Sequence, residues 1–377
     1  MKEEFREASA VLNNKYVKKW KDGGGRVVGY TCSYVPDEIF YAAGILPYRV
    51  RGFGAEAMTI GDTYFGPFIC SLPKCMLQLA GQGDFDFLDG VIITPGCDSM
   101  RRLDECWRKM GDDAGAHMPA FHFHFGVPHK FTDYSITWFI EETRRLIEEV
   151  ERHFHVTITN EKLAEAIRVH NKTRLLLERF DAIRSQAGPP ISGTDSLAVI
   201  LAGTTMPRDD YNRLLGELVG GLEKGGDKLN GRARLMLVGS ASDDVELVRL
   251  IEGDRALVVA DNLCFGTRFY SNLVREDGDP VEELAKRSLA HNDCPRMYGE
   301  YRERLNRLKE KAEKARVQGV ILQNIRFCDL HGSENGLFER DLEKAGIPCM
   351  RLEREYGPIV ESGRMRMRID AFLERIG

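Results

Sequence analysis

The stretch VIITPGCD (residues 91–98) is an apolar run that ends in a loop with a cysteine, Cys97. A similar arrangement returns late in the chain, where VILQ (residues 320–323) is followed closely by Cys328. Short continuous apolar runs bounded by turn residues predict strands that are buried on both faces, as in parallel sheets. In open α/β sheets ligands bind beyond the carboxyl ends of the strands. Both cysteines are therefore predicted to lie where ligands bind.

Further apolar runs alternate with helical stretches in the first and last parts of the chain. The expected strands are residues 26–30, 46–50, 91–94, 121–125, 233–238, 256–259, 320–323 and 348–352. Helices are expected over residues 1–20, from Pro36 onward, and in three stretches between residues 135 and 222. This pattern predicts an α/β fold of two Rossmann-like, flavodoxin-like parallel-sheet domains joined by a helical connector.

The domain boundaries are predicted where helical periodicity replaces the strand pattern. We expect an N-terminal α/β domain at residues 1–134 that carries Cys70 and Cys97, and a helical connector at residues 135–230. A C-terminal α/β domain at residues 231–377 carries Cys328. Ligands drawn from both domains would place a metal centre in the cleft between them.

The composition excludes several classes of protein. The chain has 377 residues, with 53 Lys and Arg against 58 Asp and Glu, and a net charge of −5. This mild acidity lacks the basic footprint of a nucleic-acid-binding protein. No apolar run approaches the roughly 18 residues of a membrane-spanning helix. The charged N-terminus is also unlike a signal peptide, so we expect a cytoplasmic protein with no membrane partner.

The nine cysteines are unusual for a chain expected in a reducing compartment, where structural disulfides are disfavoured. No C-x-x-C pair is present, which argues against a structural zinc site. Widely separated single cysteines fit an iron–sulfur cluster held between domains better. For Cys97 and Cys328, a buried packing thiol stays an equally weighted alternative.

Five motifs resemble the 2-hydroxyacyl-CoA dehydratase / benzoyl-CoA reductase family, in order along nearly the whole chain. They are residues 32–39 with 42–47, 67–71, 96–103, 261–268, and 326–329 with 342–348. The resemblance implies a [4Fe–4S] cluster held by Cys70, Cys97 and Cys328, with one iron left open. Cys264 also matches a family cysteine, and we expect a structural role for it. Packing roles are expected for the remaining cysteines other than Cys32, which are Cys75, Cys106, Cys294 and Cys349.

The run from Pro95 to Trp107 is most similar to the ATP-dependent class I benzoyl-CoA reductases. This similarity implies a catalytic subunit that reduces benzoyl-CoA by two electrons to cyclohexadienoyl-CoA. It implies three partners: a homologous cluster-bearing subunit, an ATP-hydrolysing activator with its own iron–sulfur cluster, and ferredoxin as the upstream donor. Two alternatives stay open. One is a 2-hydroxyacyl-CoA dehydratase subunit, which removes water by radical chemistry, and the other is a non-catalytic electron-transfer subunit.

Four further residues are candidates for contact with the acyl-CoA. Ser33 and Glu38 are hypothesised to orient the thioester carbonyl, although a first-turn glutamate is also a plain helix-capping residue. His129 and Cys32 are candidates for proton delivery. His129 follows the strand at residues 121–125, and Cys32 adjoins Ser33.

Three polar motifs allow two interpretations each. His122 and His124 alternate on one strand face, spaced for a metal pair, with the polar face of a half-buried strand as the simpler interpretation. The loop at residues 239–242 follows a strand and precedes a helix, so it is placed to receive an anion, but it lacks the ATP-binding phosphate-loop pattern. An arginine cluster after Cys97 either binds phosphate or tunes the iron–sulfur cluster, or else forms a solvated helix face; its members are Arg101, Arg102 and Arg108.

Overall fold

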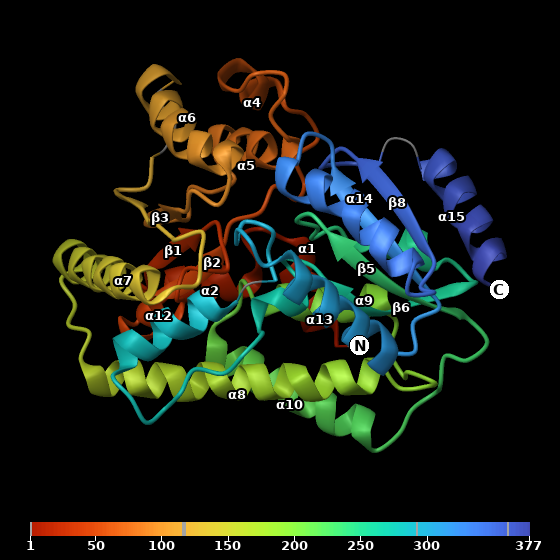
Figure 1. The fold of residues 1–377 in the computed structure, drawn as a ribbon. Coiled ribbons are helices and arrows are strands. Elements are labelled where there is room, and N and C mark those ends of the chain that lie inside the picture. Colours follow the sequence, from red (N-terminus) through yellow and green to blue (C-terminus); the bar gives the residue numbers. More distant parts are fainter. Residues whose placement is uncertain (1, 115–117, 292, 360–361) are drawn as a thin grey trace.

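The computed structural model describes residues 2–114, 118–291, 293–359 and 362–377. Within these ranges the strands form two four-stranded sheets with every pairing parallel (Figure 1). The strand orders, β2-β1-β3-β4 and β6-β5-β7-β8, are equivalent. The strands are β1 (Val27–Tyr30), β2 (Leu46–Arg49), β3 (Gly90–Ile93), β4 (Phe121–His124), β5 (Ala233–Gly239), β6 (Ala256–Asn262), β7 (Gly319–Ile325) and β8 (Cys349–Arg354).

All eight predicted strands are confirmed within one to three residues at each end, and with them the pair of Rossmann-like sheets. Every residue of β1, β2, β3 and β6 is buried, as a parallel sheet covered by helices on both faces requires. Strand β3 leads into the loop of Cys97 and β7 into the loop of Cys328.

The helices cover both sheets and connect them. They are α1 (Glu3–Ala10), α2 (Lys15–Asp22), α3 (Glu38–Ala42), α4 (Thr59–Tyr64), α5 (Ser71–Gln82), α6 (Asp98–Ala114), α7 (Asp133–Phe154), α8 (Asn160–Arg184), α9 (Gly193–Ala202), α10 (Arg208–Glu223), α11 (Val245–Glu252), α12 (Pro280–Ala290), α13 (Tyr301–Lys314), α14 (Asp329–Glu343) and α15 (Ser362–Ile376), with a short 3-10 turn, η1 (Thr267–Phe269). None of the helices in the described ranges combines the length and the apolar character that crossing a bilayer requires.

One helix prediction was wrong. The expected single helix over residues 1–20 is two helices, α1 and α2, with a break at residues 11–14. The cause is Asn14, whose side chain accepts hydrogen bonds from the backbone N–H groups of Tyr16 and Val17. Asparagine offers the backbone this alternative to a continuous helix, so it starts α2 instead of extending α1.

Helix α8 has 25 residues, which makes it about 38 Å long at about 1.5 Å per residue. In Figure 1 it runs beneath both sheets, and it contacts α3 and α12 as well as α9 and β6. Helix α12 returns from the second half of the chain to pack against α7 and α8. Its apolar side chains join the core of the first sheet, so the two halves interleave; these are Val281, Leu284, Ala285 and Leu289.

Two buried arginines on α8 hold the two halves together. Arg174 pairs with Glu38 of α3, and Arg184 pairs with Asp261 of β6 at 2.5 Å. All four side chains are at most 5% exposed. Burial alone raises the pKa of each carboxyl, but the facing guanidinium outweighs it, so both pKa values lie below their ordinary range.

We predict that Arg174→Met lowers the free energy of unfolding by about 3–5 kcal/mol, because it leaves Glu38 charged, buried and unpaired. Since the folded pKa of Glu38 is depressed, the pair stabilises the fold above the unfolded pKa of about 4.3 and is lost as pH falls. Urea unfolding at pH 7 measures the effect.

The matched control is Arg168→Met on the same helix. Arg168 pairs with Glu165, and both side chains are 55% exposed. Exposed pairs contribute at most about 1 kcal/mol, so this variant should unfold near the wild-type midpoint. Equal losses in the two variants would show that the buried pair does not hold the halves together.

Candidate functional site

Cys70, Cys97 and Cys328, here called the predicted trio, each stand at the start of a helix. Cys70 is the N-cap of α5, Cys97 directly precedes α6, and Cys328 is the N-cap of α14. The first N–H groups of a helix have no partner within it, so they are free to bond a side chain in front of the helix. Here they bond the thiols and lower their pKa values; the donors belong to Leu72, Ser99, Met100, Leu330 and His331.

The structure brings the predicted trio together from both halves of the chain. Burial raises the pKa of all three thiols, to about 11 for Cys97, and neighbouring thiols raise it further for Cys70 and Cys97. Cys328 and Cys97 both act on Cys70, and Cys328 acts on Cys97. Side-chain hydroxyls tie the loops to one another, since Ser99 bonds Cys70 and Ser240 bonds Cys328. The thiols are neutral at pH 7, so a metal bound to them must displace their protons.

The spacing of the trio differs from that of ligands around a single metal ion. In the part of the chain that the structure describes, no group of three or more His, Cys, Asp or Glu is arranged to hold a metal ion. A cube of four irons and four sulfides is wider than one ion, so its thiolates stand farther apart than those around a single ion. Three soft thiols that accept N–H and O–H hydrogen bonds match the ligand chemistry of such a cluster.

A second set of thiols lies beside the trio. This set, the inner thiol group, consists of Cys32, Cys264 and Cys294, all half-buried. Burial raises the pKa of the Cys32 thiol, and the neighbouring Cys264 thiol raises it further. Burial also raises the pKa of the Cys294 thiol, to about 11, with smaller contributions from the thiols of Cys264 and Cys32. Cys294 also raises the pKa of Cys97, so the two sets adjoin.

Three buried arginines surround the inner thiol group. The Arg49 Nη2 donates to the Cys264 Sγ at 3.1 Å, Arg268 acts electrostatically on Cys294, and Arg296 acts on Cys32. Their exposed fractions are 2–3%. Arg296 also reaches the trio, because a Cβ added at Gly96 would lie 3.9 Å from its Nε.

Several buried nitrogen atoms here have no hydrogen-bond partner. They are Nε and Nη1 of Arg49, Nε of Arg296, and both ring nitrogens of His291, which is 2% exposed. Burying such groups unpaired costs free energy unless something occupies the space between them. Burial lowers the pKa of His291 to about 3, so its ring is neutral, whereas an anionic group bound by thiolates would satisfy the guanidinium donors of Arg49 and Arg296. Cys264 and Cys294, for which structural and packing roles are predicted, thus lie beside Cys32 and buried arginines. In the sequence, a family-like motif around Cys264 was the only signal that this thiol belongs to the site, and Cys294 lies in no such motif.

The remaining predicted residues lie in different surroundings. Ser33 is half-buried beside Cys32. His129 is exposed, and its Nδ1 lies 2.9 Å from the backbone oxygen of Arg296. Glu38 is 1% exposed and committed to Arg174, so we assign it a structural role and not contact with substrate.

The polar motifs take their simpler interpretations. His122 and His124 both face Asp104 of α6, with nitrogen–oxygen distances of 2.6 and 3.3 Å. They thus form the polar face of β4 against α6. The arginine cluster is exposed on α6 and paired with acids of the same helix; its members are Arg101, Arg102 and Arg108.

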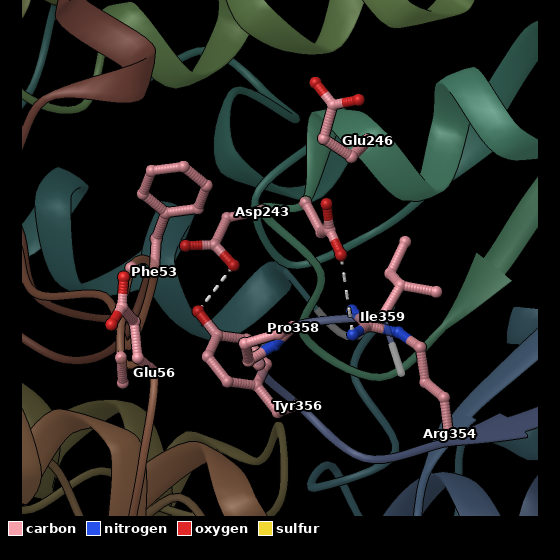
Figure 2. Close-up of a pocket in the computed structure, with 12 residues that line it drawn as sticks. Phe53, Glu56, Asp243, Glu246, Arg354, Tyr356, Pro358 and Ile359 are labelled. Carbon is pink, nitrogen blue, oxygen red and sulfur yellow. Dashed lines mark hydrogen bonds and ion pairs between the residues drawn. The ribbon is translucent and has the colours of Figure 1, made fainter. Parts of the chain in front are cut away.

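A cavity of about 420 Å³ opens between the two halves (Figure 2). Phe53 and Glu56 line it from the first half, and Asp243 and Tyr356 from the second, with the Tyr356 hydroxyl donating to Asp243 Oδ1 at 2.5 Å. This volume suits a small ligand. However, further carboxylates from Asp244 and Glu246 make the lining acidic, which disfavours the phosphates of a CoA ester.

Comparisons with known proteins identify the family of the chain. The family model described as 2-hydroxyglutaryl-CoA dehydratase, D-component, matches residues 32–376. The chain belongs to this family.

Relatives within the family carry different activities in their names. The chain is 25% identical to the (R)-phenyllactyl-CoA dehydratase beta subunit of Clostridium sporogenes, over 99% of this chain and 98% of that protein. It is 27% identical to a benzoyl-CoA reductase subunit of Thauera aromatica, over 83% and 81%. It is 24% identical to the (R)-2-hydroxyglutaryl-CoA dehydratase beta subunit of Acidaminococcus fermentans, over 99% and 98%. The family and an enzymatic subunit are thus established, and the resemblance is confirmed.

The loop at residues 239–242 supports the trio from the second sheet, and its first residue must be glycine. Gly239 has φ of 138°, and a Cβ there would lie 1.8 Å from the backbone oxygen of Gln323. We predict that Gly239→Ala lowers the unfolding free energy by more than about 1 kcal/mol, because the carboxyl ends of β5 and β7 must separate. Thermal unfolding measures it.

Gly216→Ala on α10 is the comparison variant, since a Cβ there meets nothing within 4 Å. Alanine favours a helix over glycine by up to about 1 kcal/mol, so this variant should melt at or above the wild-type temperature. A Gly239→Ala protein that melts with the wild type would disprove the close approach of the two strands.

Proposed function

We propose that this chain is the catalytic iron–sulfur subunit of an ATP-dependent class I benzoyl-CoA reductase. It would reduce benzoyl-CoA by two electrons to cyclohexadienoyl-CoA, with Cys70, Cys97 and Cys328 as ligands of a [4Fe–4S] cluster. The observation that carries the proposal is the convergence of these three thiols at three helix N-termini. Three protein thiolates leave one of four irons open to a substrate oxygen.

Each group of residues has its own part in the proposal. When bound, the cluster would supply low-potential electrons beside the open iron. The trio would anchor it, and the backbone N–H groups of α5, α6 and α14 would stabilise the sulfur charge, as hydrogen bonds to cluster sulfurs do. Ser33 and Cys32 would face the thioester, and His129, exposed beside the backbone of Arg296, would deliver protons.

The inner thiol group favours the reductase over the dehydratase. A dehydratase of the type considered recovers its electron at the end of each turnover, whereas ring reduction consumes two electrons per product. A second thiolate-bound iron–sulfur cluster at Cys32, Cys264 and Cys294 would provide a place for the second electron. The unpartnered guanidinium donors of Arg49 and Arg296 support an anionic occupant there. We therefore extend the proposal to this second cluster.

The proposed enzyme has several components. A homologous catalytic subunit, an ATP-hydrolysing activator with its own iron–sulfur cluster, and ferredoxin would supply the low-potential electrons. The relatives described above are themselves named as subunits. The sequence shows no ATP-binding phosphate loop, which fits a separate ATPase. We place the complex in the cytoplasm.

The first test is the iron content of anaerobically purified protein. Each of the single substitutions Cys70→Ala, Cys97→Ala and Cys328→Ala should remove about four irons per chain. Cys264→Ala and Cys294→Ala should remove a second set of similar size. Cys349→Ala is the matched control, because this buried thiol contacts only the backbone oxygen of Ile347 among its hydrogen-bond partners.

Two results would count against the cluster assignment. Retention of all iron in Cys97→Ala would remove the trio as ligands. A wild-type content near four irons, unchanged in Cys264→Ala, would leave the trio in place but remove the second cluster.

The second test separates reductase from dehydratase by counting electrons. The reconstituted complex receives benzoyl-CoA or a 2-hydroxyacyl-CoA with reduced ferredoxin and MgATP. We expect two ferredoxins to be oxidised per cyclohexadienoyl-CoA formed, with continuous ATP hydrolysis. Dehydration of the hydroxyacyl-CoA after one pulse of ATP, with benzoyl-CoA untouched, would establish the dehydratase alternative. A complex that transfers electrons but converts neither ester would favour the electron-transfer subunit.

A further inference from the structure

Two exposed aromatic rings meet beside two of the thiol-bearing loops. Phe68 is 77% exposed and Phe327 is 40% exposed. Their rings pack edge to face, with centroids 5.7 Å apart and an interplanar angle of 85°. Phe68 stands two residues before Cys70, and Phe327 directly precedes Cys328. The rings therefore join the two thiol-bearing loops, one from each half of the chain, at the molecular surface.

The backbone at Phe327 is strained. Its φ is 62°, in the left-handed region that bulky residues rarely adopt. Hydrogen bonds on either side hold this conformation, since Arg326 N donates to Arg354 O at 2.8 Å and Cys328 N donates to Ile325 O at 2.9 Å. The side chain nevertheless stays 40% exposed. Backbone strain that is not compensated by full burial of the side chain is typical of functional positions.

The surroundings of the pair resemble a small contact site. Arg326 is 58% exposed and lies near Glu353 and Glu355, while Asp98 and Arg101 are exposed at the start of α6, directly after Cys97. An apolar centre with a rim of both charges is the usual anatomy of an interface, and aromatic residues are enriched at such centres. Two rings form a small centre, which suits a brief redox encounter better than the extensive interface of a permanent subunit.

We propose that Phe68 and Phe327 form the docking site for the iron–sulfur protein that donates electrons to this chain. The inference rests on the proposed function, in which the trio holds a cluster. One electron leaves the donor's cluster, which is oxidised, and enters the cluster of this chain, which is reduced. The donor must approach the trio closely, and the rings mark where two of its three loops reach the surface together.

The test compares the wild-type complex with Phe68→Ala and with Phe68→Ala/Phe327→Ala. Iron and sulfide content and reduction by titanium(III) citrate should stay unchanged, because a small reductant needs no docking site. Stopped-flow reduction by the purified ATP-hydrolysing activator with MgATP should slow at least tenfold in the double variant. Met367→Ala on α15 is the control, since Met367 is 68% exposed and far in sequence from the trio's loops.

Three outcomes would overturn the docking site. The first is an unchanged activator-driven rate in an iron-loaded double variant. The second is loss of iron from both variants, which would make the rings a structural cover. The third is failure to assemble with the homologous subunit in size-exclusion chromatography, which would make the face a subunit interface. Absence of iron from the wild type would remove the proposed function as well, so the two failures are distinguishable.

Discussion

Two buried guanidinium groups on α8 determine how the halves of this protein sit against each other. Arg174 and Arg184 point to opposite halves, and each would be a costly unpaired charge without its carboxylate. The partners Glu38 and Asp261 belong to α3 and β6, which pack with the first and second sheet. A single long helix thereby fixes two sheets in one arrangement. The meeting of the loops after β3 and β7, and with it the site, depends on that arrangement.

Positive electrostatic potential, from helix N-termini and arginine side chains, dominates the region where the loops meet. Three helix N-termini direct N–H groups at the predicted trio, and three buried arginines surround the inner thiol group. Both arrangements favour negative charge. The free thiols of Cys32, Cys70, Cys97 and Cys294 do not supply it, because burial raises their pKa values. Metal-bound thiolates would, so binding of a cluster and stability of this interior are expected to be coupled.

The fold was predictable because its signals are local. Each strand is a short apolar run between turn residues, and parallel sheets buried on both faces leave that imprint directly in the sequence. The break between α1 and α2 was missed because Asn14 is equally plausible within a polar helical stretch until its capping bonds are seen. The return of α12 to the first half was also missed, since its apolar face gives no indication of which helices it covers.

For the site, the sequence by itself placed Cys97 and Cys328 after strands, and the family motifs added Cys70. It determined which thiols are positioned at loop and helix boundaries, because those boundaries are set by neighbouring residues. Only the tertiary structure decided that Cys294 joins Cys32 and Cys264 beside buried arginines, and that Glu38 belongs to an ion pair. The reason is physical: burial and charge pairing depend on residues more than a hundred positions apart, whose contacts exist only after the two sheets have packed against α8.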